Sequence, residues 1–367
     1  MKVCFRVDSS SLIGTGHVMR CLTLAEWLKK NDCEIGFICR ELPGNLCHLV
    51  ELRGFKLQRL PHDGTIHGSE NVNKKKNNFH SDWLSVSWQN DAEQSANLLR
   101  SESPIDWVIV DHYAIDEKWE KIMRSHAKKV MVIDDLADRR HDCDLLLDQN
   151  LYHDTATRYD NLVPAHCKKL LGPTYALLRP EFIQARKKIR ARGGNVNRVL
   201  IFFGGSDPTN ETTKTLESFA LLNRPEIVLD VVVGGTNEHR DQIKQICYKR
   251  PNTNFNCQVD NMAELMVLAD LAIGAGGATT WERCFLGLPA IILITAHNQQ
   301  ETSAAVAEAG AVWNLGLCQQ VDAKQLAKTI EHFLQCPSDL TAMTDSALRI
   351  MRTGTGVSSV SGEILEY

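Results

Sequence analysis

The sequence has no apolar run of the ~20 residues that span a bilayer. None of its twelve cysteines forms a CxxC pair, and HDCD at residues 141–144 matches a zinc site only weakly. An excess of one charge is also absent, since 41 basic and 45 acidic residues give a formal net charge of −4. The start, MKVCFRVDSS, lacks the apolar core of a signal peptide. We therefore expect a cytoplasmic protein with reduced thiols, no metal, and no nucleic-acid or membrane partner.

A dinucleotide-binding fingerprint is missing as well. The first glycine turn, SSSLIGTGHVMRC at residues 9–21, follows an apolar run typical of a strand, KVCFRVD. The fingerprint G-x-G-x-x-G requires glycine where Met19 stands. The next expected strand, EIGFICR, ends in Arg40 instead of the acidic residue that holds a ribose. We therefore expect no nicotinamide cofactor, and no cofactor of another kind.

What the sequence does contain is a regular alternation of strand and helix patterns. This predicts an α/β fold with two Rossmann-like, doubly wound domains that face a cleft at the carboxyl ends of their strands. We expect an N-terminal domain over residues 1–180, a C-terminal domain over 195–345, and a tail, 346–367, with a helix that returns to the first domain. A charged stretch, RPEFIQARKKIRARGGN, predicts a long helix at the boundary. The polar residues 62–82 predict a surface loop.

The first glycine turn favours a histidine held beside a ligand. Gly14 and Gly16 allow close approach of the backbone to a ligand, and His17 opens the following helix. Because a helix N-terminus disfavours an imidazolium, His17 is expected to be neutral and able to accept a proton. The alternative is that His17 only packs at the start of the helix.

Two further glycine turns occur in the second half of the chain. FFGGSDPTN at residues 202–210 leads into a helix whose free N–H groups would attract phosphate, or it is a simple strand–helix turn. GAGGATTWERC at 274–284 places Glu282 in the first turn of a helix. That carboxylate either accepts both hydroxyls of a ribose or complements the helix dipole. Together the two turns favour a nucleotide as the ligand.

Longer motifs give a specific resemblance. They are RVDSSSLIGTGHVMRCLTLA, VDHYAID, VIDDLADRRHDCDLLLDQN, LLGPTYALLRPEF, FFGGSDPTN, DNMAELM and GAGGATTWERCFLGLPAI, in this order. Over about residues 3–300 the sequence resembles the bacterial UDP-sugar hydrolases of pseudaminic acid biosynthesis. Those enzymes act on UDP-2,4-diacetamido-2,4,6-trideoxy-β-L-altropyranose. The insertion at 62–80 and the tail, RTGTGVSSVSGEILEY, depart from the family pattern.

The resemblance implies a glycosyltransferase-B fold and a metal-independent hydrolase of a UDP-sugar, in a pathway that supplies flagellin and surface-polysaccharide glycosylation. It implies that His17 is the catalytic residue and that Tyr113 lies near the sugar. In the related fold the C-terminal glycine loops hold UDP, a glutamate holds the ribose, and Met262 lies against the uracil. The expected substrate-binding residues are Arg6, Asp8, Gly14, Gly16, Gly204, Gly205, Ser206, Met262, Gly276, Gly277, Thr279, Glu282, Asn298 and Gln299.

The expected reaction is attack of water on the anomeric carbon with inversion, with His17 taking the proton of the water. Arg6, Asp8 and Asp111 are expected to point towards the cleft from strand ends, and Asp8 either orients His17 or a sugar hydroxyl, or it caps the turn. Tyr113 either holds the sugar, polarises the water or closes the core. The pair Asp134 and Asp135 resembles a paired-carboxylate site, but without a metal it is expected to turn the chain and cap the next segment. Two alternatives remain: a glycosyltransferase of the same fold, and a non-catalytic protein that binds a nucleotide sugar.

Overall fold

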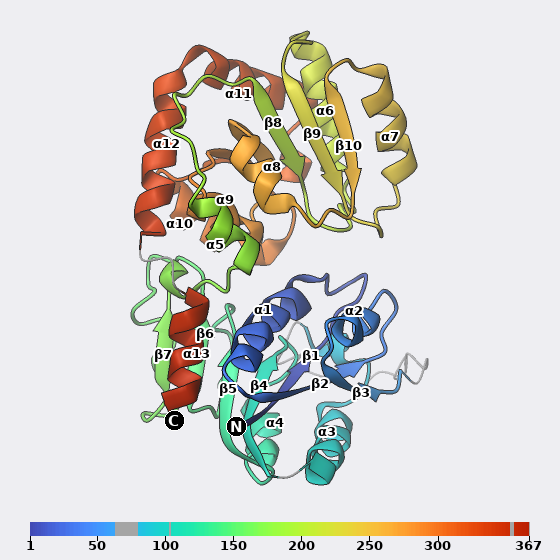
Figure 1. The fold of residues 1–367 in the computed structure, drawn as a ribbon, viewed down its shortest axis with the longest axis vertical. Coiled ribbons are helices and arrows are strands. Elements are labelled where there is room, and N and C mark those ends of the chain that lie inside the picture. The colour runs from blue at the N-terminus through green and yellow to red at the C-terminus, as the bar shows by residue number, and fades with distance from the viewer. Residues whose placement is uncertain (63–79, 103, 353–355, 367) are drawn as a thin grey trace. The chain divides into compact units, whose positions relative to one another are not determined.

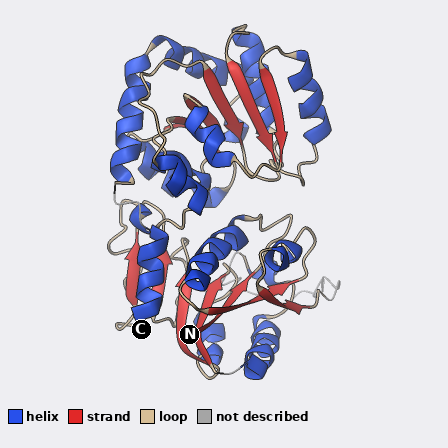
Figure 2. Cartoon of the chain, in the orientation of Figure 1, coloured by secondary structure: helices blue, strands red, loops and turns tan. Residues whose placement is uncertain are grey.

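The computed structural model describes residues 1–62, 80–102, 104–352 and 356–366, so most of the predicted polar loop lies outside the described residues. The chain forms two compact units (Figures 1 and 2). The first unit comprises the described parts of Met1–Asn150, Asp154–Leu177 and Thr355–Tyr367. The second comprises those of Leu151–His153 and Leu178–Gly354. Each unit is built on one parallel sheet, which confirms the predicted α/β class.

The sheet of the first unit has seven strands in the order β3-β2-β1-β4-β5-β6-β7. The strands are β1 (Lys2–Val7), β2 (Glu34–Arg40), β3 (Lys56–Leu60), β4 (Ile105–Asp111), β5 (Ala127–Ile133), β6 (Leu145–Asp148) and β7 (Lys168–Leu171). The strand order reverses between β1 and β4, which is where open parallel sheets bind ligands, beyond the carboxyl ends of the strands.

Apolar side chains alternate across this sheet and build a core on each of its faces. Along β1, Val3 and Phe5 pack on one face and Cys4 on the other. The first face is covered by α1 (Gly16–Lys30), α2 (Cys47–Leu52) and α13 (Gly356–Glu366), and the second by α3 (Trp88–Glu102) and α4 (Glu117–Met123) (Figure 1). Short 3-10 turns span Ser81–Leu84 (η1) and Pro173–Tyr175 (η2). The C-terminal helix α13 packs against α1, so the end of the chain completes the first unit.

The sheet of the second unit has six strands in the order β10-β9-β8-β11-β12-β13. They are β8 (Arg198–Phe202), β9 (Val228–Val233), β10 (Thr253–Cys257), β11 (Leu271–Ala275), β12 (Ala290–Ile294) and β13 (Trp313–Leu317). The α-helices are α5 (Pro180–Arg186), α6 (Glu211–Leu222), α7 (Arg240–Lys249), α8 (Met262–Leu268), α9 (Thr279–Phe285), α10 (Gln300–Glu308), α11 (Ala323–Gln335) and α12 (Pro337–Ile350). Short 3-10 turns span His297–Gln299 (η3) and Cys318–Gln320 (η4).

The long helix predicted at the boundary is wrong, because α5 ends at Arg186. Beyond it the backbone is irregular, and the buried side chain of Arg192 donates hydrogen bonds to the carbonyls of Met266, Ala269 and Leu286. Gly194 adopts a φ of +79°, and a Cβ there would lie 2.0 Å from the carbonyl oxygen of Pro337. These contacts with distant segments override the helical propensity of the charged residues.

Candidate functional site

The turn between β1 and α1 is closed by its own polar groups. The N–H of Gly14 donates to the carbonyl of Ser10 at 2.8 Å, and the Ser10 hydroxyl accepts from the N–H of Ile13 at 2.9 Å. Gly14 has a φ of +82°, a conformation that favours glycine. A Cβ on Gly16 would meet nothing within 4 Å, so packing does not require glycine there. The turn ends at the start of α1 and makes His17 the second residue of that helix.

His17 is held by a carboxylate on the neighbouring strand. Its Nδ1 lies 2.6 Å from Oδ1 of Asp111, the last residue of β4, and its side chain is 10% exposed. Since an ionised carboxylate only accepts hydrogen bonds, it fixes the proton on Nδ1 and leaves the lone pair on Nε2. Burial pushes the pKa of Asp111 upward, but the charge of Arg20 and the hydrogen bonds from Arg20 and His17 outweigh it and hold that pKa below its usual range. The arrangement is that of a base and the acid that orients it.

A second carboxylate extends the site towards Tyr113. The Tyr113 hydroxyl donates to Oδ1 of Asp135, and Arg20 Nη1 donates to Oδ2 of the same residue at 3.2 Å. The Tyr113 ring lies edge-on to His17 at 4.7 Å and stacks with Trp83 at 5.4 Å between ring centroids. Burial, followed by the charge of Asp135, raises the pKa of Tyr113 well above its usual value. Tyr113 therefore stays protonated and lies beside His17.

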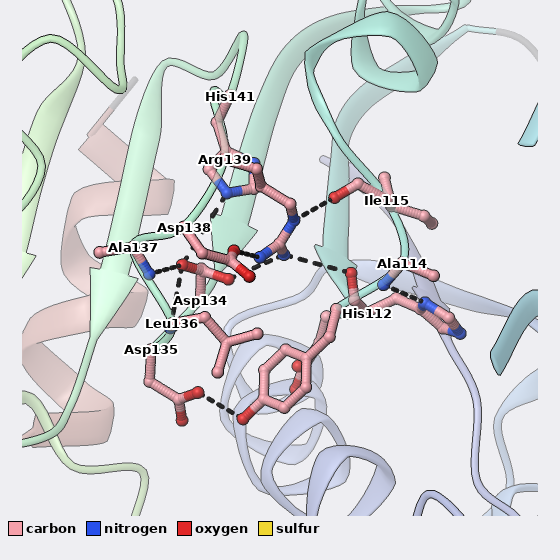
Figure 3. Close-up of polar contacts among 12 residues, drawn as sticks. His112, Ala114, Ile115, Asp134, Asp135, Leu136, Ala137, Asp138, Arg139 and His141 are labelled. Atoms are coloured by element: carbon pink, nitrogen blue, oxygen red, sulfur yellow. Dashed lines mark hydrogen bonds and ion pairs between the residues drawn. The ribbon is translucent and has the colours of Figure 1, made fainter. Parts of the chain in front are cut away.

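The adjacent acids Asp134 and Asp135 have different roles. Asp134 caps the following turn by accepting from the N–H groups of Leu136 and Ala137, the role predicted for both acids, and it also pairs with Arg139 (Figure 3). Asp135 extends away from this turn (Figure 3). Its carboxylate accepts hydrogen bonds from Arg20 and Tyr113. Only the second acid of the pair faces the candidate site.

Arg6 and Asp8 lie in a buried ion cluster next to this site. Arg6 bonds both oxygens of Asp8, at 2.6 and 2.8 Å, and both oxygens of Asp91. Asp8 also accepts from the N–H of Arg40 and lies 3.3 Å from Nε2 of His112. Burial raises the pKa of Asp8, but Arg6 and His112 outweigh it and hold that pKa below its usual range. The expectation that Asp8 orients His17 is wrong, because Asp111 makes that contact.

In the second unit, three loops follow the adjacent strands β8, β11 and β12. Gly204 and Gly205 follow β8, and Gly204 has a φ of +96°. Asp207 accepts from the N–H groups of Glu211 and Thr212, each at 2.9 Å. The expected phosphate site at the start of α6 is therefore already capped by a carboxylate. This leaves the backbone of Gly204, Gly205 and Ser206 as the part of the loop that can face an anion.

The loop after β11 leads into α9, where the carboxylate of Glu282 is bound by Arg179. Arg179 donates to Oε1 of Glu282 from Nε at 3.1 Å and from Nη2 at 3.0 Å. The other oxygen, Oε2, is buried and has no hydrogen-bond partner among the described residues. Burial raises the pKa of Glu282, although Arg179 opposes this. A carboxylate held by one oxygen, with the other unsatisfied, is suited to accept ligand hydroxyls.

The remaining predicted residues lie around the same edge of the second sheet. Gly276 and Gly277 precede α9, which begins at Thr279, and a Cβ on Gly276 would lie 2.2 Å from the Ser303 hydroxyl. Gln299 accepts from the N–H of Thr295 at 3.1 Å, which fixes its side chain, whereas Asn298 is exposed. Met262 is the first residue of α8 and is buried.

Several residues of the site were absent from the predicted set. They are Arg20, Trp83, Asp135 and Ser303, while Asp111 was expected to point towards the cleft but was given no role. Arg20 could have been found from its spacing, because a residue three positions after His17 on a helix lies on the same face. Asp111 and Asp135 each stand at or just beyond the end of a buried strand, the position where a parallel sheet presents ligand-binding residues. No comparable signal marks Trp83 or Ser303.

The weak metal motif at 141–144 has other partners in the structure. Nδ1 of His141 lies 2.7 Å from Glu120, Arg124 pairs with Asp142 and Asp144, and the Cys143 sulfur lies 3.5 Å from that of Cys167. Among the described residues, His332, Cys336 and Asp339 are the ones whose ligand atoms gather within 4.8 Å. The two nitrogens of His332 face different partners, Nδ1 the thiol and Nε2 the carboxylate.

Asp148, at the end of β6, is expected to make the stability depend on pH. The Tyr159 oxygen lies 3.1 Å from its Oδ2 and 3.0 Å from Oδ2 of Asp134, and one hydroxyl hydrogen cannot serve both acids. Burial and the charge of Asp135 raise the pKa of Asp148 to about 8. Because the folded state binds this proton more tightly than the unfolded state, its contribution is complete below pH ~4 and is lost as the pH rises towards 8.

Asp148→Asn should remove this dependence. In urea unfolding between pH 5 and 9, the stability of the wild type relative to the variant should fall as the pH rises, by up to about 1.4 kcal/mol per pH unit. Asp241→Asn, at an exposed aspartate of α7, is the control and should leave the pH dependence unchanged. A constant difference between wild type and Asp148→Asn would show that Asp148 is ionised in the folded protein.

Two parallel-sheet α/β units, with polar residues and glycine turns at the carboxyl ends of their strands, form a fold of the glycosyltransferase-B type. Residues 199–355 match the glycosyltransferase family 28 C-terminal domain. A spinosyn rhamnosyltransferase solved with thymidine diphosphate superposes with a TM-score of 0.65 over all of both chains, at 18% identity. The predicted fold class is therefore confirmed.

Two relatives cover most of the chain. The UDP-2,4-diacetamido-2,4,6-trideoxy-β-L-altropyranose hydrolase of Campylobacter jejuni is 27% identical over 84% of this chain and 97% of its own length. An uncharacterized protein of Methanocaldococcus jannaschii is 29% identical over 82% of this chain, which spans 57% of that relative. The resemblance predicted from the motifs is confirmed by the first of these.

Among the described helices, none is long and apolar enough to cross a membrane.

Proposed function

We propose that this protein hydrolyses a UDP-linked 2,4-diacetamido-2,4,6-trideoxy sugar to UDP and the free sugar, as a step in pseudaminic acid biosynthesis. The observation that carries the proposal is the His17–Asp111 pair at the carboxyl ends of β1 and β4, at 2.6 Å. A histidine in this arrangement can take a proton at Nε2. The similarity to the Campylobacter jejuni hydrolase supports the choice of substrate.

In the proposed reaction, His17 Nε2 removes a proton from water as its oxygen attacks the anomeric carbon. The bond from that carbon to the phosphate oxygen breaks, the electron pair leaves with UDP, and the products are UDP, the free sugar and a proton. Attack from the side opposite the departing UDP inverts the anomeric centre. Tyr113, held by Asp135 and edge-on to His17, is proposed to hold the sugar or polarise the water. Arg6 and Asp8 are proposed to act by fixing the strand ends beneath the substrate.

The second unit is proposed to hold the nucleotide. The N–H groups of Gly204, Gly205 and Ser206, together with the turn at Gly276, Gly277 and Thr279, would meet the diphosphate charge. Oε2 of Glu282 would accept the ribose hydroxyls, Met262 would pack on the uracil, and Asn298 and Gln299 would lie near the sugar–phosphate bond. The buried Oε2 of Glu282, which has no hydrogen-bond partner in the described part of the chain, supports this assignment most directly.

Glu282→Gln is expected to weaken UDP binding about ten- to a hundredfold, because charge-assisted hydrogen bonds contribute about 1.5–3 kcal/mol. Isothermal titration calorimetry measures the effect. With 2′,3′-dideoxy-UDP the wild type and the variant should bind alike, since the hydroxyls are missing. Glu264→Gln, at an exposed glutamate in the first turn of α8, is the matched control. Equal loss with both ligands would place Glu282 away from the ribose.

A glycosyltransferase is the second candidate, favoured by the match of residues 199–355 to family 28 and by the rhamnosyltransferase fold. Proton NMR of the purified protein with the UDP-sugar, in EDTA and without an acceptor, separates the candidates. Stoichiometric UDP and free sugar, with the first-formed anomer inverted, is the expected result. An intact substrate that is nevertheless bound would favour a transferase that lacks its acceptor, or a non-catalytic binding protein.

A further inference from the structure

We propose that Arg20 is a positioning residue that keeps His17 neutral by sharing the carboxylate of Asp111 with it. This inference rests on the proposed function only where activity is the readout. In this role the guanidinium of Arg20 does not need to contact the substrate. This role also explains why the carboxylate beside the proposed base carries a second cationic partner.

Arg20 and His17 both bind the carboxylate of Asp111, and we refer to these three residues as the fork. Arg20 follows His17 by three residues on α1 and donates to both oxygens of Asp111, from Nε to Oδ2 at 2.6 Å and from Nη2 to Oδ1 at 2.7 Å. Oδ1 is also the atom that lies 2.6 Å from Nδ1 of His17. Asp111 is fully buried, and the Arg20 side chain is 10% exposed. The single carboxylate of Asp111 therefore binds both a guanidinium that is always charged and a histidine ring that can be protonated.

The charges in this fork oppose protonation of His17. An isolated carboxylate beside a histidine stabilises the imidazolium. Here Arg20 neutralises most of that charge, and its Nη2 lies 3.3 Å from Nδ1 of His17. Protonating the ring would therefore place a second positive charge against the guanidinium, in a site where little water screens it. The N-terminus of α1 acts in the same direction. The lone pair on Nε2 stays available to accept a proton.

Other titratable groups face this fork and must be counted. Asp135 accepts from Nη1 of Arg20 at 3.2 Å, and it is also paired with Tyr113. Among the described residues, Cys21 on α1 donates to Oδ2 of Asp111, and the ring of His80, which precedes η1, lies 5.2 Å from that of Tyr113. Nε2 of His112 faces Asp8 instead. Asp135 is a second anion that, with Asp111, offsets the charge of Arg20. Removing Asp135 should therefore have the opposite effect on His17 from removing Arg20.

The test is an NMR titration of the His17 ring in the substrate-free protein with labelled histidine, assigned with a His17→Asn sample. Arg20→Gln should raise the titration midpoint of His17 by about one to two pH units, and Asp135→Asn should lower it. Arg20→Lys, which keeps the charge, should restore most of the wild-type behaviour. Arg53→Gln, at an exposed arginine of the same unit, should leave the midpoint unchanged.

Activity gives a second readout. The acid limb of the kcat/KM profile should move with the NMR midpoint, upward for Arg20→Gln and downward for Asp135→Asn. A midpoint that shifts in a protein without hydrolase activity would support the role of Arg20 and refute the proposed function. If both variants leave the midpoint in place, or shift it in the same direction, the role of Arg20 is refuted whatever the turnover. Because Asp135→Asn retains Arg20, it still decides the question if Arg20→Gln does not fold.

Discussion

His17→Asn is expected to lower kcat by about 10²–10⁴-fold while the affinity for UDP stays within experimental error. The loss follows from removing the nitrogen that takes the proton of the attacking water. UDP binding should survive because the residues assigned to the nucleotide lie in the second unit, whereas His17 lies in the first. Turnover is measured by UDP release, and affinity by calorimetry on the same samples.

His48→Asn is the matched control, because this exposed histidine on α2 lies in the same unit. It should keep wild-type turnover and affinity. Wild-type turnover in His17→Asn would mean that another group takes the proton or that water attacks without base assistance. Loss of UDP binding in this variant would show that His17 helps to hold the nucleotide.

The parts of the site that local patterns determine were predictable from the sequence. Gly14 sits where the turn requires a positive φ, and the helix that follows places His17 at its start. The glycine turns after β8 and β11 follow apolar strands and lead towards helices, so their place at the carboxyl edge of the second sheet followed from the alternation of strand and helix.

The parts that depend on long-range pairing were not predictable. Asp8 and Asp111 both stand at the end of a buried strand near a histidine, and the register of β1 against β4 decides which of them reaches His17. Asp91 lies in the first turn of α3, but its carboxylate is bound by Arg6 and Arg40 from two strands of the sheet. Asp207 resembled part of a phosphate loop, yet it satisfies the N–H groups that the phosphate was expected to use.

The fork of Arg20, His17 and Asp111 combines residues that are close in the sequence with residues that are far apart in it. Arg20 and His17 are paired by helix geometry, and the strand order then brings Asp111 and Asp135 to them from two further connections. The base, its orienting acid and the cation that shares this acid are thus assembled at the point where the strand order reverses. Substitution of any one of these residues is therefore expected to change the proton chemistry of the site, even if the fold survives.

Asp111→Asn is expected to lower kcat by about 10²–10⁴-fold, close to the loss for His17→Asn. An amide can present its N–H group to the ring, which would favour the tautomer with the proton on Nε2 and remove the base from the attacking water. The double variant His17→Asn/Asp111→Asn should then be little worse than either single variant, because the two residues act as one unit.

Stability must be separated from catalysis in this experiment, because Asp111→Asn leaves Arg20 beside a neutral amide in a buried site. Asp134→Asn is the control, since this equally buried acid caps a turn and pairs with Arg139. Its melting temperature should fall while its folded fraction keeps turnover, whereas the folded fraction of Asp111→Asn should not. Additive losses in the double variant would mean that Asp111 acts on the reaction independently of His17.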